Sequence, residues 1–458
     1  MKLEISGIAK IGEAKVELKG ITVIAGENNT GKSTIGKVLF AMNDFMYGFD
    51  EYIEFDIKNA IRSEISSLGD YLDVLGKEYH ASNKQFRRKT AKVKTLCENY
   101  TQRIYEMFSN HNKSKLNFVL KQYTKEHLEL YQVLYDMHEQ EVAPRIEEVV
   151  ASLYEVFDMN ENELGTGSVT KSFEDVFNGQ INSLSMPDAY GEVVFTDDYG
   201  KSTTVRISDD VCYYVDCNTP VRNPAIFIEN PRIVDRINAR TWAYFSDQYT
   251  NKSMLEVRRE RLRRALSPSN NFYFGKRPRK LYAEEMSEAK ITITQKKLKR
   301  VKELIYEAVP GEYTTENGEL HYREPGMAKA IKLQNLSTGL KAMVLLDQII
   351  SVGLLNEKTT LILDEPEINL HPEWQLLYAE IIVLLQEIYD LNIIITTHSP
   401  YFLKAIEGFV KKENRQENSK YYLTEIVDGE FVISDMSDRM NVLYRMLAEP
   451  LRVLKQMD

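Results

Sequence analysis

Three short apolar runs in this chain have the pattern of buried parallel strands. They cover residues 21–25, 361–363 and 393–395, and polar residues follow each of them. Apolar runs without alternation are typical of strands that are covered on both faces of a sheet. After the first run, helical spacing predicts a helix over residues 34–42, with apolar positions at Ile35, Val38, Leu39 and Met42. The pattern therefore predicts an α/β fold class.

The segment from about residue 46 to 165 reads as mostly helical. It has no glycine between Gly76 and Gly165, and Pro144 is its one proline. Apolar residues recur there at helical spacing, as at Leu116, Val119, Leu120 and Tyr123. The heptads are not sustained, so the pattern predicts a compact helical insertion rather than a long coiled-coil rod.

The remaining elements alternate between strands and helices. Two strand-like runs, 193–195 and 203–207, flank the turn residues 197–200 and predict a β-hairpin. The other predicted elements are a strand at 225–228, helices at 233–266 and 283–309 around a loop at 267–278, a hairpin at 313–333 that turns at 316–318, two strands between 421 and 433 around 428–429, and a last helix at 440–457.

These elements divide the chain into five predicted parts. The first and last parts form one head, because the apolar strands lie near both ends of the sequence. The parts are residues 1–45 (head), 46–190 (helical insertion), 191–240 (β-rich segment returning to the head), 241–324 (basic helical insertion) and 325–458 (head).

The loop after residues 21–25 fits the phosphate-loop pattern GxxxxGK[ST], from Gly26 to Ser33. Its glycines let backbone N–H groups turn toward phosphate oxygens, and the following helix points its positive end at them. Lys32 is expected to contact the β- and γ-phosphates, and the Ser33 hydroxyl to bind Mg²⁺. The predicted nucleotide contacts in this loop are Asn28, Asn29, Thr30, Gly31, Lys32, Ser33 and Thr34.

Acidic and imidazole side chains follow the other two apolar runs. Asp364 can hold Mg²⁺, and Glu365 can orient and deprotonate an attacking water. His398 follows residues 393–397, at a strand end where ligands gather in open α/β sheets, and it is predicted to contact the γ-phosphate. The predicted catalytic residues are Glu365 and His398, and the predicted metal ligands are Ser33 and Asp364.

Together these motifs resemble the ABC ATPases of the SMC and RecF type. More narrowly, they resemble bacterial AAA-type ATPases related to the OLD family and to anti-phage systems such as Septu and PARIS. The sequence Asn335–Lys341 stands at the family's signature motif, and residues 368–372 resemble its D-loop. The resemblance implies that Ser337 and Gly339 contact the γ-phosphate held by a second head. Thr338 and Leu340 depart from the transporter pattern, which favours the SMC-like branch, and no glutamine matches the Q-loop.

Composition bounds the setting of the protein. The chain has 458 residues with 43% hydrophobic content, enough for two or three domains. Its three cysteines, Cys97, Cys212 and Cys217, form no paired framework, which predicts a reduced, cytoplasmic location. No run of about 18 apolar residues is present, so the sequence predicts no membrane contact.

Charge is distributed unevenly. The formal net charge is −10, yet residues 251–302 carry 16 Lys/Arg against 5 Asp/Glu. Three clusters make this basic segment: residues 258–264, 276–280 and 296–302. Such a segment can bind DNA or RNA, dock an acidic protein partner, or form a solvated surface.

The sequence leaves several functions open. The first is an ATP- and Mg²⁺-dependent ATPase that pairs head to head and acts as sensor or scaffold of an anti-phage complex. Its nuclease would be a separate chain, because only 60 residues follow His398. The alternative is a RecF- or SMC-like ATPase that binds DNA directly. A transporter subunit and a nucleotide switch without turnover are further hypotheses.

Overall fold

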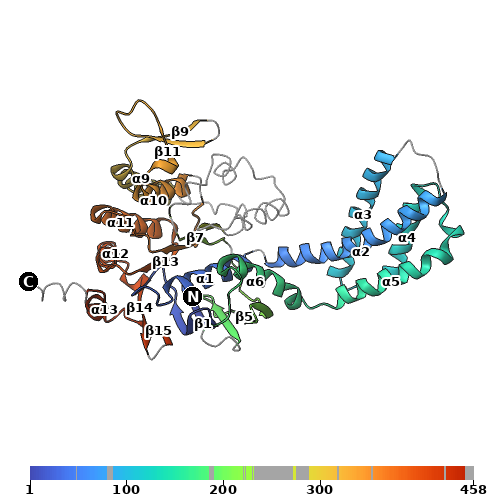
Figure 1. Ribbon diagram of the computed structural model, residues 1–458, viewed down its shortest axis with the longest axis horizontal. Helices are drawn as coiled ribbons and strands as arrows, with labels where there is room; N and C mark the ends of the chain where they lie inside the picture. Colours follow the sequence, from blue (N-terminus) through green and yellow to red (C-terminus); the bar gives the residue numbers. More distant parts are fainter. Residues whose placement is uncertain are drawn as a thin grey trace, which may run out of the picture. The chain divides into compact units, whose positions relative to one another are not determined.

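The computed structural model describes most of the chain (Figure 1). The backbone divides into two compact units. The head contains residues 1–47 and 169–458, and the helical unit contains residues 48–168, so both ends of the sequence contribute to the head. The described residues are 1–47, 49–79, 86–184, 190–219, 221, 223–229, 231, 272–274, 288–316, 319–351, 354–427 and 430–448.

A central sheet organises the head. Among the described residues its strand order is β15-β14-β3-β13-β12-β7-β8. The five inner strands are parallel, and β15 and β8 run antiparallel at the two edges. The bounds are β3 (Ile21–Gly26), β7 (Ile226–Ile228), β8 (Phe272–Phe274), β12 (Thr360–Asp364), β13 (Asn392–Thr397), β14 (Ser419–Val427) and β15 (Glu430–Asp435).

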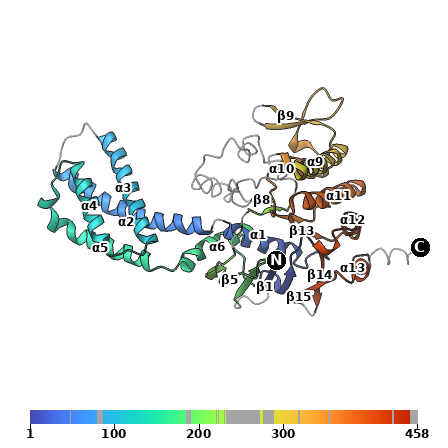
Figure 2. The same ribbon diagram turned by 180° about the vertical axis from the view of Figure 1, so that it is seen from behind.

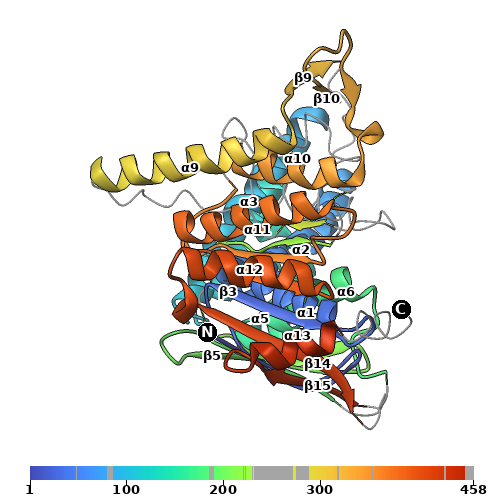
Figure 3. The same cartoon turned by 90° about the vertical axis from the view of Figure 1, so that its left-hand side faces the viewer.

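Helices cover both faces of this sheet, because alternate residues of its buried strands point to opposite sides. On one face Gly36 of α1 (Lys32–Met46) lies against Ile362, and Phe40 packs on Phe227 with ring centroids 6.0 Å apart. The opposite face shares one hydrophobic core with the later helices, of which α11 and α12 are in front in Figure 3. These helices are α9 (Glu288–Ala308), α10 (Thr338–Ser351), α11 (Pro372–Tyr389), α12 (Pro400–Lys412) and α13 (Met440–Leu447).

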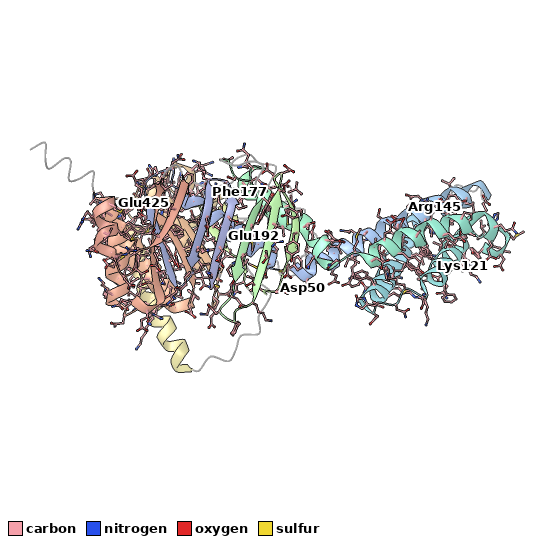
Figure 4. All side chains as sticks on the ribbon, turned by 90° about the horizontal axis from the view of Figure 1, so that it is seen from below. Asp50, Lys121, Arg145, Phe177, Glu192 and Glu425 are labelled. Atoms are coloured by element: carbon pink, nitrogen blue, oxygen red, sulfur yellow. The ribbon has the colours of Figure 1, made fainter. Side chains whose placement is uncertain are left out.

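A second, antiparallel sheet of the head has the order β2-β1-β4-β5-β6. It joins the central sheet where the Glu17 N–H donates to the Tyr422 hydroxyl at 2.8 Å. In Figure 4, Glu192 marks β4 of this sheet and Glu425 marks β14 of the central sheet. The bounds are β1 (Lys2–Ile8), β2 (Ile11–Glu17), β4 (Gly191–Thr196), β5 (Ser202–Ser208) and β6 (Val211–Asp216), and α6 (Glu161–Phe177) precedes β4.

A third, small sheet leads into α10. It contains β9 (Glu312–Glu316), β10 (Glu319–Arg323) and β11 (Ile331–Lys332), followed by the 3₁₀ turn η4 (Leu333–Asn335). Before this sheet, α9 packs against α11, and Lys297 and Arg300 form ion pairs with Glu387 and Glu380. Lys297 and Arg300 of the third predicted cluster therefore form ion pairs on the surface of the head.

In the helical unit α2 packs against α3, α4 and α5 (Figure 2). Buried aliphatic side chains recur every three or four residues along α2, and all are at most 2% exposed. They are Ile57, Ile61, Ile65, Leu68 and Leu72. Its elements are α2 (Phe49–Tyr79), α3 (Phe86–Ser109), α4 (Leu116–Glu129), η1 (Tyr135–Met137) and α5 (Glu139–Asp158).

The predicted α/β head with a large helical insertion is confirmed, and most predicted elements are present. Two details differ, and a third set of predictions lies outside the described residues. The helical unit ends at Ser168, where the sequence placed the end of the insertion at 190. The predicted loop 267–278 contains strand β8, which pairs with β7. The predicted helix 233–266, the 258–264 and 276–280 clusters and residues 449–457 of the last helix lie outside the described residues.

A buried carboxylate fixes α13 to α12. Glu407 of α12 accepts hydrogen bonds from Lys411 at 2.6 Å, Lys404 at 2.9 Å and the Tyr444 hydroxyl of α13 at 2.5 Å. Burial raises the pKa of this carboxyl, but the three hydrogen bonds outweigh burial and hold the pKa at about 2. The charged form is therefore the one that the folded state stabilises.

This depressed pKa predicts a pH-dependent contribution to stability. The contribution is complete above the ordinary glutamate pKa and is lost as pH falls toward about 2. Glu407→Gln should lower the free energy of unfolding by roughly 1–2 kcal/mol at pH 7, allowing for solvent screening. Urea unfolding followed by circular dichroism should show this deficit shrinking at pH 3. Glu413→Gln, which removes the same charge just after α12, should cost little, and an equal Glu407→Gln deficit at both pH values would contradict the assignment.

Candidate nucleotide-binding site

The loop between β3 and α1 has the backbone of an anion cradle. Asn29 and Gly31 both have left-handed backbone angles, with φ of 69° and 78°. Gly31 precedes the first residue of α1 and supplies no side-chain cap, so the first-turn N–H groups have no side-chain acceptor there. Uncapped amides at a helix N-terminus bind anions such as phosphate.

Polar side chains hold this loop in place. The Thr30 hydroxyl donates to the Glu27 carbonyl at 2.7 Å and lies 2.7 Å from the Thr424 hydroxyl of β14. Lys10 of the β1–β2 turn donates to the side-chain oxygen of Asn29. Among the other predicted contacts, Asn28 is exposed, and Thr34 lies in the first turn of α1, where its N–H donates to Gly31.

Lys32 places a buried cation inside this loop. Its ammonium donates to the carbonyls of Gly26 at 3.0 Å and Glu27 at 2.5 Å, and the side chain is 3% exposed. Burial lowers the pKa of Lys32, and the carboxylates of Glu365 and Asp364 oppose that shift. The cation thus has backbone carbonyls and two carboxylates as its surroundings.

Ser33 at the start of α1 contacts Asp364 at the end of β12. The Ser33 hydroxyl donates to Asp364 Oδ1 at 2.9 Å, and the Thr396 hydroxyl donates to the same oxygen. Burial raises the pKa of Asp364, and these two hydrogen bonds counteract it. A hydroxyl beside a carboxylate is an oxygen donor set that suits Mg²⁺. Among the described residues no group of three His, Cys, Asp or Glu forms a separate metal cluster.

Glu365 is held in a strained position beside the other predicted groups. Its φ is 48°, and its N–H donates to the carbonyl of Thr396 at 3.1 Å and to the Thr396 hydroxyl at 3.0 Å. Its carboxylate lies 3.7 Å from Lys32 Nζ and 3.4 Å from His398 Nδ1. A non-glycine residue in the left-handed region costs energy and is often found at functional sites. The structure therefore brings Lys32, Glu365 and His398 together.

Glu367 also belongs to this group, although the sequence did not predict it as a site residue. It is 4% exposed, and Thr397 donates to its Oε1, while Oε2 has no hydrogen-bond partner among the described residues. Burial raises its pKa, and the bond from Thr397 opposes that shift. His398 Nδ1 lies 3.9 Å from Glu367 Oε1. The signal available in the sequence was a third acid two residues after Glu365, with Pro366 between them.

A second residue missed from the sequence is Glu229, which follows β7. The parallel register pairs Ile228 with Leu363, so Glu229 lies next to Asp364 at the same edge of the sheet. Lys37 of α1 forms an ion pair with Glu229 at 3.2 Å. An acid ending the apolar run at 225–228 was the available signal.

The predicted signature residues lie apart from this cluster. The Ser337 hydroxyl accepts from the Leu340 N–H at 3.3 Å and is exposed at the start of α10. Among the described residues, no hydrogen bond or ion pair joins Ser337 or Gly339 to the phosphate loop. Gly339 is buried, and a Cβ there would lie 2.9 Å from the Asn369 carbonyl. Gly339 of the signature segment thus packs tightly against Asn369 and Trp374.

Comparison with known proteins adds a family match. Residues 227–404 match the family described as AAA domain, putative AbiEii toxin, Type IV TA system, and the match spans β7 to α12. The head has the fold of an ABC-type P-loop ATPase head. The phosphate loop of this ATPase head lies before the matched range, and strand pairing places it beside β13.

Solved structures of SMC heads also match. The SMC head domain from Thermotoga maritima matches with 14% identity and a TM-score of 0.33, covering 95% of this chain and 97% of that chain. An SMC head bound to the C-winged helix domain of ScpA matches with 12% identity and a TM-score of 0.41, covering 96% and 98%. No curated protein matches the sequence. None of the described helices has the length and apolar character of a membrane span.

The tight packing at Gly339 generates a prediction. Gly339→Ala should destabilise the ATPase head by about 1–3 kcal/mol, because the added methyl meets a backbone carbonyl that must move. Gly408→Ala in α12 is the matched control, since nothing lies within 4 Å of its Cβ position. Alanine favours a helix interior over glycine, so Gly408→Ala should be neutral or stabilising. Urea unfolding of the two variants measures the difference, and equal effects would refute close packing at Gly339.

Proposed function

We propose that this chain binds ATP with Mg²⁺ and hydrolyses the nucleotide slowly. The observation that carries this is the convergence of Lys32, Ser33, Asp364, Glu365 and His398 at the carboxyl ends of β3, β12 and β13. Phosphate-loop ATPases need a cradle of amides, a lysine, a metal-binding hydroxyl and carboxylate, and a group that activates water. All of these are present at this edge.

Each residue then has a distinct chemical role. The amides after Gly31 and the Lys32 ammonium bind phosphate oxygens, and the oxygens of Ser33 and Asp364 hold Mg²⁺, which neutralises phosphate charge when bound. Glu365 orients a water and accepts its proton. His398, whose Nδ1 lies 3.4 Å from the Glu365 carboxylate, contacts the terminal phosphate. Lys32 now binds loop carbonyls, so it exchanges these acceptors for phosphate oxygens on binding.

The same function includes pairing with a second copy. Ser337 is exposed and is not joined to its own phosphate loop among the described residues. Gly339 packs against Asn369, and Ile368, which precedes Asn369, is 43% exposed. A surface-directed signature segment with an apolar neighbour supports binding of another head, whose γ-phosphate Ser337 and Gly339 then contact. The site is complete only in the dimer.

At the cellular level, the proposal is a sensor or scaffold subunit of a bacterial anti-phage complex, with a nuclease in a separate chain. The description of the matching family names a toxin of a type IV toxin–antitoxin system, which agrees with the proposed role in anti-phage defence. The alternative, a RecF- or SMC-like ATPase that binds DNA, rests on the excess of Lys and Arg at 251–302. Mass measurement of the protein co-purified with the products of its neighbouring genes distinguishes the two.

Substitution of Glu365 tests the catalytic assignment. Glu365→Gln should retain ATP and Mg²⁺ binding and lose about 10²–10⁴ in hydrolysis rate, because the amide keeps the size but accepts no proton. Lys32→Ala is the contrasting control and should lose ATP binding itself. Calorimetric binding and single-turnover hydrolysis separate the two effects. Wild-type turnover in Glu365→Gln would show that another group activates the water.

Mixed dimers test pairing of heads. Lys32→Ala chains lose nucleotide binding. Ser337→Arg chains bind nucleotide but lose the contact with the nucleotide of their partner. Each variant alone should be inactive, whereas a mixture should recover activity, because one composite site per mixed dimer is intact. Hydrolysis rates of the mixture measure this. No recovery after demonstrated subunit exchange would argue against composite sites.

A further inference from the structure

The strand order indicates on which side of β3 each end of the proposed nucleotide lies. Asp364, Glu365 and His398 follow β12 and β13, which lie on one side of β3 in the central sheet. The strands β14 and β15 lie on the other side of β3. With the terminal phosphate beside β12 and β13, the rest of the nucleotide extends across the phosphate loop toward β14 and β15.

Apolar side chains lie beside the phosphate loop on the side of β14 and β15. A Cβ on Gly31 would lie 3.6 Å from Ile11 Cγ1 and 3.7 Å from Phe431 Cδ1, so both side chains reach the backbone of the phosphate loop. Ile11 starts β2 and is 3% exposed, whereas Phe431 of β15 is half-buried. The two come from different sheets and flank the same glycine.

The exposed partner of Phe431 extends this surface. Ile426 of β14 pairs directly with Phe431, so the two side chains share one face of the hairpin. Ile426 is 51% exposed. On the same face of β14, two residues earlier, Thr424 bonds to Thr30 of the phosphate loop. This face of the hairpin therefore runs from the loop outward to an exposed apolar pair.

We propose that Phe431, together with Ile11 and Ile426, forms the ledge on which the nucleobase rests. The inference builds on the proposed function and adds the part of the nucleotide that the motifs do not cover. A half-buried aromatic ring offers a flat apolar surface, and every base has a π-face that stacks on such a ring. Recognition by stacking accepts any purine, so affinity for the base comes from surface contact with the C-terminal hairpin.

The test compares two ligands that share their phosphates. ATP and inorganic tripolyphosphate are titrated, each with Mg²⁺, into the full-length wild type and into Phe431→Ala. The variant should bind ATP about 5- to 100-fold more weakly, the range expected from loss of one aromatic stacking contact. Its affinity for tripolyphosphate should equal that of the wild type, because the phosphate loop is unchanged.

Two further variants make the result specific. Val432→Ala changes the next residue of β15, which is 39% exposed and points to the opposite face, and should leave ATP affinity unchanged. Phe431→Trp keeps a stacking surface and should bind ATP like the wild type, with a change in tryptophan fluorescence for ATP and none for tripolyphosphate. This variant also gives a readout if Phe431→Ala fails to fold.

Each other outcome overturns the proposal in a recognisable way. Equal weakening of ATP and tripolyphosphate in Phe431→Ala would mean that Phe431 supports the phosphate loop instead of the base. Unchanged ATP affinity in Phe431→Ala, with strong binding of both ligands to the wild type, would refute the ledge alone. A wild type that binds neither ligand would refute the proposed function and the ledge together.

Discussion

Parallel backbone pairing of β3 with β13, and of β13 with β12, is the interaction on which the rest of the head depends. It sets Ala25 beside Thr397, and Asp364 beside Thr396, in one continuous register. Residues that are hundreds of positions apart in the chain therefore end at the same edge of the sheet. Parallel strands require long crossover connections, and in this chain the helical unit occupies one of them.

That shared edge concentrates charge in a partly buried place. Lys32 lies among carbonyls and carboxylates, while Asp364 and Glu367 are carboxyls whose pKa values are raised by burial. Hydroxyls of Ser33, Thr396 and Thr397 offset part of this cost by donating to the two buried carboxyls. Perturbed titration of several neighbouring groups is typical of functional sites. The threonines that end β13 are thus as much part of the site as the acids.

The sequence predicted the parts whose signal is local. The runs at 21–25, 361–363 and 393–395 are apolar apart from Thr22, because both faces of their strands are covered. The glycine and lysine spacing of the phosphate loop follows from phosphate geometry. Glu367 and Glu229 escaped prediction because their roles come from burial and from strand register, which a sequence pattern does not display. Strand β8 escaped because it is short and depends on pairing with β7. The end of the helical unit at Ser168 is set by packing, since α6 continues past it.

The hydroxyl of Thr396 makes two hydrogen bonds at this edge. It donates to Asp364 and accepts from the backbone N–H of Glu365. One small group therefore links the carboxylate proposed for the cation to the residue proposed for water activation. A displacement of Asp364 of a few tenths of an ångström would be felt by the strained backbone of Glu365 through a single oxygen. In the proposed ATPase, binding of the cation at Asp364 and orientation of the Glu365 backbone are therefore coupled through this one hydroxyl.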